Sequence, residues 1–307
     1  MRLECVPNVS EGRRPEVVAR LVRAVAAPGV AVLDVSSDPD HNRSVLTLAG
    51  EPGALLDGLL ALYAEALEAI DLGRQTGVHP RVGAVDVVPF VPLAGAAMSD
   101  AIAAAEALGA AVAERFDLPV FLYEEAARRP GRSLPEIRRG GVAGLAARMA
   151  SADWHPDFGP ARLHPRAGAT VIGARFFLIA FNVVLAGADL GVAQAIARAV
   201  RASSGGLPAL RAIGVWLESR GRAQVSLNLL DYRRTSLATA LSAVAQEAAA
   251  RGARVERTEL VGLAPEEALL GSLAELLALP SLTPGRVLEN RLRETGEDLP
   301  RHAVEGA

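Results

Sequence analysis

The residue best suited to acid-base chemistry is His79, in the segment GVHPRVGAVD. Pro80 favours an extended backbone at this histidine, and Gly77 and Gly83 permit a ligand to approach the main chain closely. An imidazole with a pKa near about 6.5 can accept one proton and donate another at neutral pH, which suits a transfer reaction. On position alone, the alternative is a turn histidine that is hydrogen-bonded locally.

Two polar segments could assist this histidine. Residues 36–44, SSDPDHNRS, include Asp38 and Asp40, and a carboxylate here would orient the imidazole and raise its basicity. Residues 158–175, FGPARLHPRAGATVIGAR, combine glycine and proline with several arginines, as expected of a cradle for an anionic ligand. The alternatives are an ordinary polar turn for the first segment and a solvated hinge for the second.

The sequence also excludes several chemistries. None of the five histidines has the i, i+4 pairing with a glutamate that marks a zinc helix, so we predict no metal site. Neither the G-x-S-x-G elbow of hydrolases nor a dinucleotide-binding G-x-G-x-x-G motif occurs after a strand. All 32 residues counted as Lys+Arg are arginine, which excludes a lysine Schiff base and a Walker-type phosphate loop.

The hydrophobic periodicity predicts the elements that must position these residues. The order β-α-β-β-α-β, the split unit of ferredoxin-like folds, is expected twice. In the first half we expect strands at 4–9, 30–35, 43–50 and 82–91, with helices at 15–26 and 54–72. In the second half we expect strands at 176–185, 209–217, 223–230 and 253–262, with helices at 189–200 and 236–250.

The predicted fold class is therefore α+β, with two ferredoxin-like subdomains that span residues 1–174 and 175–307. Between the two repeats we expect a helix at 101–116, a strand at 119–123, and a linker and loop region from Glu124 to Arg175. A leucine-rich helix is expected after Leu263, and the tail from Glu294 is expected to be loose.

The composition limits where the protein is expected in the cell and which partners it is expected to bind. The longest apolar run, 176–188, is interrupted by Asn182 and is shorter than the roughly 20 residues of a membrane-spanning helix. A net charge of −3 and 4% aromatic residues argue against nucleic acid as a partner and against a ferredoxin-like RNA-binding module. With Cys5 as the only cysteine and no apolar leader in the first residues, we expect a cytoplasmic protein.

Four motifs together resemble a known family. ECVPNVSEG, GVHPRVGAVDVVPF, DFGPARLHPRAGATVIGARFFLIAFN and AQVSLNLLDY follow one another in the order seen in glutamate formimidoyltransferases, from about residue 3 to residue 270. The resemblance implies that the two subdomains pack around a ligand channel. It also implies a homodimeric enzyme that moves the formimidoyl group of N-formimidoyl-L-glutamate to N5 of tetrahydrofolate, its co-substrate, late in histidine degradation.

The resemblance also assigns roles to residues. It implies that His79 is the catalytic acid-base. From their charge and their place near the loops, we also expect four arginines to hold the carboxylates of glutamate and of the folate tail: Arg43, Arg81, Arg162 and Arg166. The folate contacts that it implies are Gly159, Pro160, Ala161, Arg162, Leu163, His164, Pro165, Arg166, Ala167 and Gly168.

Two departures from the family pattern set further expectations. The animal enzymes have an acidic residue where this chain has Ser36, so the carboxylate partner of His79 is expected at Asp38 or Asp40. They also carry a cyclodeaminase domain for which this chain has no room, so a separate cyclodeaminase is expected to act downstream. Two alternatives stay open: a folate-dependent transferase with a formyl-glutamate or formimidoyl-glycine donor, and a non-catalytic folate-binding protein.

Overall fold

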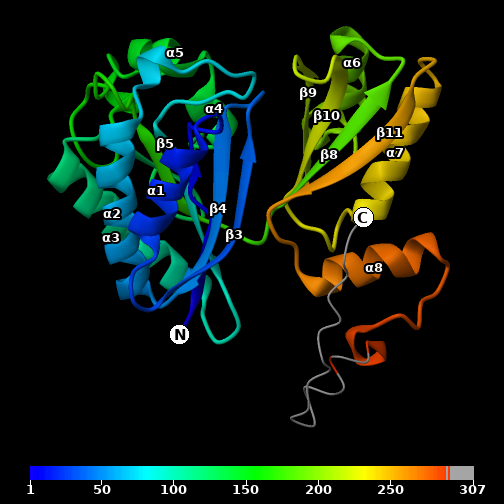
Figure 1. The fold of residues 1–307 in the computed structure, drawn as a ribbon, viewed down its shortest axis with the longest axis horizontal. Coiled ribbons are helices and arrows are strands. Elements are labelled where there is room, and N and C mark those ends of the chain that lie inside the picture. Colours follow the sequence, from blue (N-terminus) through cyan, green and yellow to red (C-terminus); the bar gives the residue numbers. More distant parts are fainter. Residues whose placement is uncertain (288–289, 291–307) are drawn as a thin grey trace. The chain divides into compact units, whose positions relative to one another are not determined.

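The computed structural model describes residues 1–287 and 290, so the expected loose tail from Glu294 lies outside the described residues. The chain forms two compact units, each with a sheet and helices packed on it (Figure 1). The first contains Met1–Phe177, Trp216–Arg222 and Val261–Leu263, and the second contains Leu178–Val215, Ala223–Leu260 and the described residues from Ala264 on. The domain boundary expected between residues 174 and 175 stays a prediction.

The sheet of the first unit begins with a strand that proline divides. β1 (Leu3–Cys5) and β2 (Asn8–Val9) are separated at Pro7, which has no N–H to donate to a neighbouring strand. Both pair antiparallel with β4 (Arg43–Gly50) on one side and with β5 (Val85–Pro92) on the other, while β3 (Val30–Asp38) pairs with β4. With α1 (Pro15–Val25) and α2 (Pro52–Ala69), this order confirms the expected ferredoxin-like unit.

Two parallel strands extend this sheet beyond β5. β7 (Thr170–Ala174) lies between β5 and β6 (Val120–Glu124), and α3 (Met98–Phe116) connects β5 to β6. The expectation that residues 124–175 are only linker and loop is therefore wrong. The five residues of β7 are all buried, so this short strand lacks the polar alternation by which a strand is recognised in sequence.

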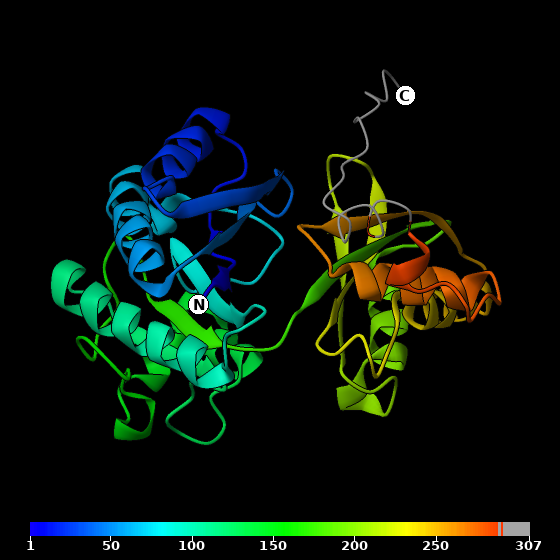
Figure 2. The same ribbon diagram turned by 90° about the horizontal axis from the view of Figure 1, so that it is seen from below.

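Helices cover both faces of the parallel part of the sheet. On one face α1, α2 and α3 pack in a row (Figure 2), and Leu21, Leu59 and Tyr63 are fully buried there. On the opposite face α4 (Leu134–Arg138) and α5 (Gly141–Arg148) pack against β6 and β7. Each fully buried leucine contributes about 1.5–3 kcal/mol to the free energy of folding. This core therefore fixes the strands that position the candidate site.

The second unit repeats the ferredoxin-like topology. Its sheet has the order β11, β8, β10, β9, which is the arrangement of β5, β1/β2, β4 and β3 in the first unit. The elements are β8 (Ile179–Ala186), α6 (Leu190–Val200), β9 (Leu210–Leu217), β10 (Arg222–Leu229), α7 (Leu237–Ala249) and β11 (Arg254–Val261). The expected helix after Leu263 is α8 (Glu266–Leu276).

Short helices and capping residues complete the fold. Asp189 and Ser236 cap the N-termini of α6 and α7 with their side chains. The described residues also form four 3₁₀ helices: η1 (Leu72–Arg74), η2 (Ala152–Trp154), η3 (Ala202–Ser204) and η4 (Pro284–Arg286). Within residues 1–287 and 290, no helix combines the length and the apolar character needed to cross a membrane.

Candidate functional site

A buried ion pair fixes the turn that follows His79. The backbone N–H groups of Val82 and Gly83 donate to Oδ1 of Asp86, at 2.7 Å and 3.2 Å. The other carboxylate oxygen pairs with Arg138 of α4, and the two side chains are only 3% and 11% exposed. Because Asp86 is the second residue of β5, this pair attaches the turn to the rigid sheet and to the helix that covers it.

The loop that carries His79 is also bound to the turn between β3 and β4. Arg81 donates to the carbonyl of Asn42 at 2.9 Å and to that of His41, and Val78 N–H donates to the carbonyl of Asp40 at 3.2 Å. Asn42 has a left-handed backbone, with φ 45°, which asparagine tolerates better than most residues. The structure thus brings together the 36–44 and 72–81 segments.

The hydrogen-bond partners of His79 define the form of its imidazole. Nδ1 lies 2.8 Å from the carbonyl oxygen of Pro80, and Nε2 contacts a terminal nitrogen of Arg43. A carbonyl can only accept and a guanidinium can only donate. We therefore assign the proton to Nδ1 and the lone pair to Nε2, which is the neutral form that can act as a base.

The surrounding charge keeps His79 neutral. Burial, together with the positive charges of Arg43 and Arg138 and the neighbouring His41, lowers the pKa of His79 well below its usual value. Burial and repulsion from Arg138 and Arg81 lower the pKa of Arg43 to about 9, so Arg43 is still protonated at neutral pH. The environment therefore opposes the rise in basicity that we expected from a nearby carboxylate.

The two carboxylates expected to pair with His79 have other contacts. Asp38, at the end of β3, accepts a hydrogen bond from the backbone N–H of His41 at 2.8 Å and so closes the turn. The carboxylate of Asp40 accepts from the backbone N–H of Ser219 at 3.0 Å and from its hydroxyl, and its backbone carbonyl binds the His79 loop. Because the two ring nitrogens of His79 contact Arg43 and Pro80, its pairing with either carboxylate stays a prediction.

The loop expected to contact folate runs directly beside the turn that follows His79. Ala169 N–H donates to the carbonyl of Val82 at 2.9 Å, and Gly83 and Gly168 form an antiparallel bridge. A Cβ atom at Gly83 would lie 1.8 Å from the carbonyl oxygen of Ala169. The close approach that we expected from a ligand at Gly83 is therefore made by the protein's own backbone.

Within that loop the residues differ in exposure. Ala161, Arg162, Pro165 and Arg166 are exposed, whereas Ala167 and Gly168 are buried. His164 exchanges two backbone hydrogen bonds of 2.9 Å with Gly168, and its Nδ1 accepts from Ala167 N–H at 3.0 Å. Arg162 forms an exposed ion pair with Asp117 of the α3 C-terminus. The loop has a defined shape, and its folate contacts stay a prediction.

Asp86 and Arg138 support the candidate site and were not predicted from the sequence. A signal for Asp86 was present, because a single carboxylate stands inside the apolar strand VDVVPFV, and buried charges are rarely found without a partner. No feature of the sequence indicated that Arg138 would be its partner. It is 52 residues from Asp86 in sequence and lies in the segment that we expected to be linker.

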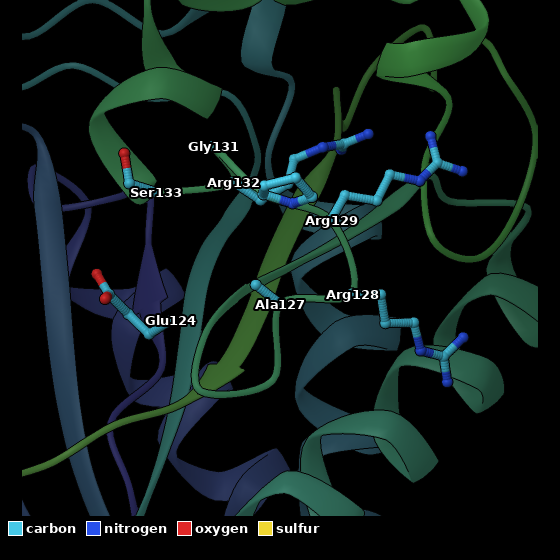
Figure 3. Close-up of a pocket in the computed structure, with 8 residues that line it drawn as sticks. Glu124, Ala127, Arg128, Arg129, Gly131, Arg132 and Ser133 are labelled. Atoms are coloured by element: carbon cyan, nitrogen blue, oxygen red, sulfur yellow. The ribbon is translucent and has the colours of Figure 1, made fainter.

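The first unit also has an arginine-rich pocket whose lining does not include His79. It has a volume of about 390 Å³ and is lined by Glu124, Ala127, Arg128, Arg129, Pro130, Gly131, Arg132 and Ser133. In Figure 3 the side chains of Arg128 and Arg129 extend away from Glu124. These guanidinium groups have other partners, since Arg128 pairs with Glu106 while Arg129 and Arg132 donate to backbone carbonyls of residues 152–155. We therefore place the candidate site at His79.

The fold and the site together define an α+β protein of two ferredoxin-like units, with a neutral histidine among arginines that suit an anionic substrate. Residues 2–175 match the family model of the formiminotransferase domain, N-terminal subdomain, and residues 180–277 match that of the formiminotransferase domain. The chain belongs to the formiminotransferase domain family. In the described part of the chain, no group of three or more His, Cys, Asp or Glu side chains is arranged to hold a metal ion.

Named relatives cover the chain almost completely. Glutamate formimidoyltransferase of Streptococcus pyogenes serotype M1 is 39% identical over 293 residues, which are 94% of this chain and 98% of the relative. The glutamate formimidoyltransferase of Thermoplasma acidophilum is 40% identical, covering 95% and 97%. Formimidoyltransferase-cyclodeaminase of Sus scrofa is 43% identical over 89% of this chain. The chain spans about half the length of that last relative, 52%.

Proposed function

We propose that this protein is a glutamate formimidoyltransferase, which transfers the formimidoyl group from N-formimidoyl-L-glutamate to N5 of tetrahydrofolate. The observation that carries the proposal is the identity of 39–40% to two proteins of that name over nearly the whole of both chains. The neutral imidazole of His79, set among cationic side chains, supports it. Both substrates carry carboxylates, and a cationic site favours such ligands.

The reaction needs one proton removed and one supplied. The formimidoyl group is an amidine whose protonated carbon is electrophilic, so the N5 amine forms the new C–N bond without a covalent enzyme intermediate. After this bond forms, N5 bears a surplus proton, and the nitrogen of glutamate must gain a proton as its own C–N bond breaks. Binding both substrates in the correct orientation supplies much of the rate acceleration.

In this proposal His79 moves both protons. Its Nε2, which carries the lone pair, accepts the proton from N5 and then donates it to the departing nitrogen of glutamate. The Nδ1–H bond to the carbonyl of Pro80 holds the ring in the required tautomer. The loop from Gly159 to Gly168 is proposed to contact folate, because it lies directly beside the His79 turn.

The first experiment mixes the purified protein with tetrahydrofolate and formimidoyl-glutamate and follows 5-formimidoyltetrahydrofolate by absorbance. We expect His79→Ala to lower kcat by at least about 100-fold, with the fold and the tetrahydrofolate affinity unchanged. His155→Ala, at an exposed histidine outside the cluster, is the matched control and should behave as wild type. An unchanged rate in His79→Ala would contradict the role of His79.

The same assay separates the alternatives. Faster turnover with formyl-glutamate or formimidoyl-glycine than with formimidoyl-glutamate would assign a different donor. Tight tetrahydrofolate binding without turnover of any donor would identify a folate-binding protein. We also propose a homodimer, which analytical ultracentrifugation tests, and a cytoplasmic location, which fits the single buried cysteine and which cell fractionation tests.

A further inference from the structure

Arg43 has an unusual set of partners for a charged side chain. One terminal nitrogen contacts Nε2 of His79 and the other contacts Oδ1 of Asn8, so both acceptors are neutral. Its Nε is buried and has no hydrogen-bond partner. The guanidinium is charged but the imidazole is neutral, so their hydrogen bond lacks the attraction between opposite charges that a carboxylate held by two N–H groups would add. Arg43 would therefore bind a carboxylate more strongly than it binds His79.

The neighbouring charges favour an anion at Arg43. Arg81 and Arg138 repel it, and the carboxylate that attracts it, Asp86, is already occupied by Arg138 and by the backbone of Val82 and Gly83. This cluster thus has more positive than negative charge. An incoming carboxylate would complement it, and the guanidinium would present two parallel N–H groups to that carboxylate.

The contact with Arg43 also prevents His79 from acting as a base. The lone pair of Nε2 is directed at the guanidinium, so it is not available to a proton on N5 of the folate. A base that is covered in this way has to be uncovered before the transfer. The ligand that draws Arg43 away would therefore also prepare His79 for catalysis.

The chemistry of the donor identifies which carboxylate this is. In formimidoyl-glutamate the departing nitrogen and the α-carboxylate are bonded to the same carbon atom. A group that protonates this nitrogen and a group that binds this carboxylate must therefore be neighbours, as His79 and Arg43 are. The carboxylates of the folate tail, in contrast, are separated from N5 by the whole p-aminobenzoate ring.

We propose that Arg43 leaves His79 to bind the α-carboxylate of the glutamate donor, and that this movement of the guanidinium uncovers Nε2 of His79. The inference rests on the proposed transfer reaction. In this proposal Arg43 determines donor specificity. It also couples donor binding to the exposure of Nε2 of His79, the atom that accepts the proton. Such a link keeps the imidazole covered until its substrate is present.

The kinetic test compares Arg43→Met and Arg43→Lys with wild type on two donors: formimidoyl-glutamate, and formimidoyl-4-aminobutyrate, which lacks only the α-carboxylate. Wild type should prefer the glutamate donor by at least tenfold in kcat/KM, and Arg43→Met should lose that preference. The KM for formimidoyl-glutamate should rise at least tenfold and the KM for tetrahydrofolate less than twofold. Arg20→Met, which removes an exposed arginine paired with Glu65, is the control and should match wild type.

Two outcomes would overturn the proposal: an unchanged preference between the donors in Arg43→Met, or a KM that rises for tetrahydrofolate alone, which would assign Arg43 to the folate tail. If Arg43→Met does not fold, Arg43→Lys retains the charge without the paired N–H groups and should show a smaller loss of preference.

A binding measurement separates this proposal from the proposed function. Calorimetric binding of L-glutamate should weaken at least tenfold in Arg43→Met, whether or not the protein turns over. In wild type, glutamate should shift the ¹⁵N resonance of His79 Nε2, and in Arg43→Met it should not. Glutamate binding that is equal in both proteins would contradict the role of Arg43 even if the transferase assay succeeds.

Discussion

At the scale of single residues, the central feature is an imidazole held neutral by its surroundings. Burial and two guanidinium groups, those of Arg43 and Arg138, disfavour the protonated form of His79, and the Pro80 carbonyl fixes its tautomer. A base must be unprotonated before it can act. This environment therefore keeps His79 in its neutral form at neutral pH, and in our proposal the donor then exposes Nε2 by drawing Arg43 away.

The pH dependence of the reaction tests this arrangement. The neutral form of His79 is active and its pKa is lowered from its usual value of about 6.5, so activity should be lost only on acidification below that pH. We expect kcat/KM to stay level from about pH 6.5 to 8 and to fall at lower pH. In Arg43→Lys the acid limb should stay below pH 6.5, because the charge is retained. A wild-type midpoint above pH 6.5 would contradict the assignment.

At the scale of elements, the site depends on the ion pair between β5 and α4. Asp86 closes the turn after His79 and pairs with Arg138, so a strand, a turn and a helix are joined at one carboxylate. A buried ion pair gives little net stability, but removing one partner leaves the other charge buried and unpaired. The pair therefore acts mainly to fix the geometry.

We expect Asp86→Asn to lower the free energy of unfolding by about 3 kcal/mol, because Arg138 loses its counter-charge. The matched control is Asp117→Asn, which breaks the exposed ion pair with Arg162 and should change stability by less than about 1 kcal/mol. Urea unfolding followed by circular dichroism measures both. Equal effects of the two substitutions would show that the Asp86 pair has no special role.

At the scale of the whole molecule, the site belongs to one of two units with related topology. His79, Arg43, Asp86 and Arg138 all lie in the first unit, whose sheet has the two additional parallel strands β6 and β7. The loop from Gly159 to Gly168 lies between these two strands in sequence and runs beside the His79 turn. The first unit must therefore stay folded for the site to exist.

The reactivity of the single cysteine tests how tightly the core of the first unit is packed. Cys5 is fully buried in the core of the first unit, and burial, together with the nearby Glu4, raises the pKa of its thiol. Because the thiolate is the reactive form, we expect a disulfide reagent such as dithionitrobenzoate to react at least about 100-fold more slowly with the native protein than in denaturant. Rapid reaction of the native protein would contradict this packing, and Cys5→Ser provides the blank.

Much of the fold could be predicted because its elements have local signals. The helices from Pro15 and Leu237 have an apolar face, and strands such as Arg43–Gly50 are apolar runs between polar turns. The strand Thr170–Ala174 was missed because it is short and buried on both faces. The motif around His79 pointed to the candidate site, but Asp86 and Arg138 became visible as a pair only in the structure.

The sequence by itself determined the order of the elements within the two repeats, the duplicated topology and the choice of His79, because periodicity and ordered motifs are properties of the chain alone. The tertiary structure decided which charges surround that histidine. Arg43 is 36 residues from His79 in sequence, and the pKa of an imidazole depends on distances and on burial in a medium of low dielectric constant. Spacing along the chain carries no information about either, so the guanidinium groups around His79 became visible only in the structure, while its pairing with Asp38 or Asp40 stays a prediction.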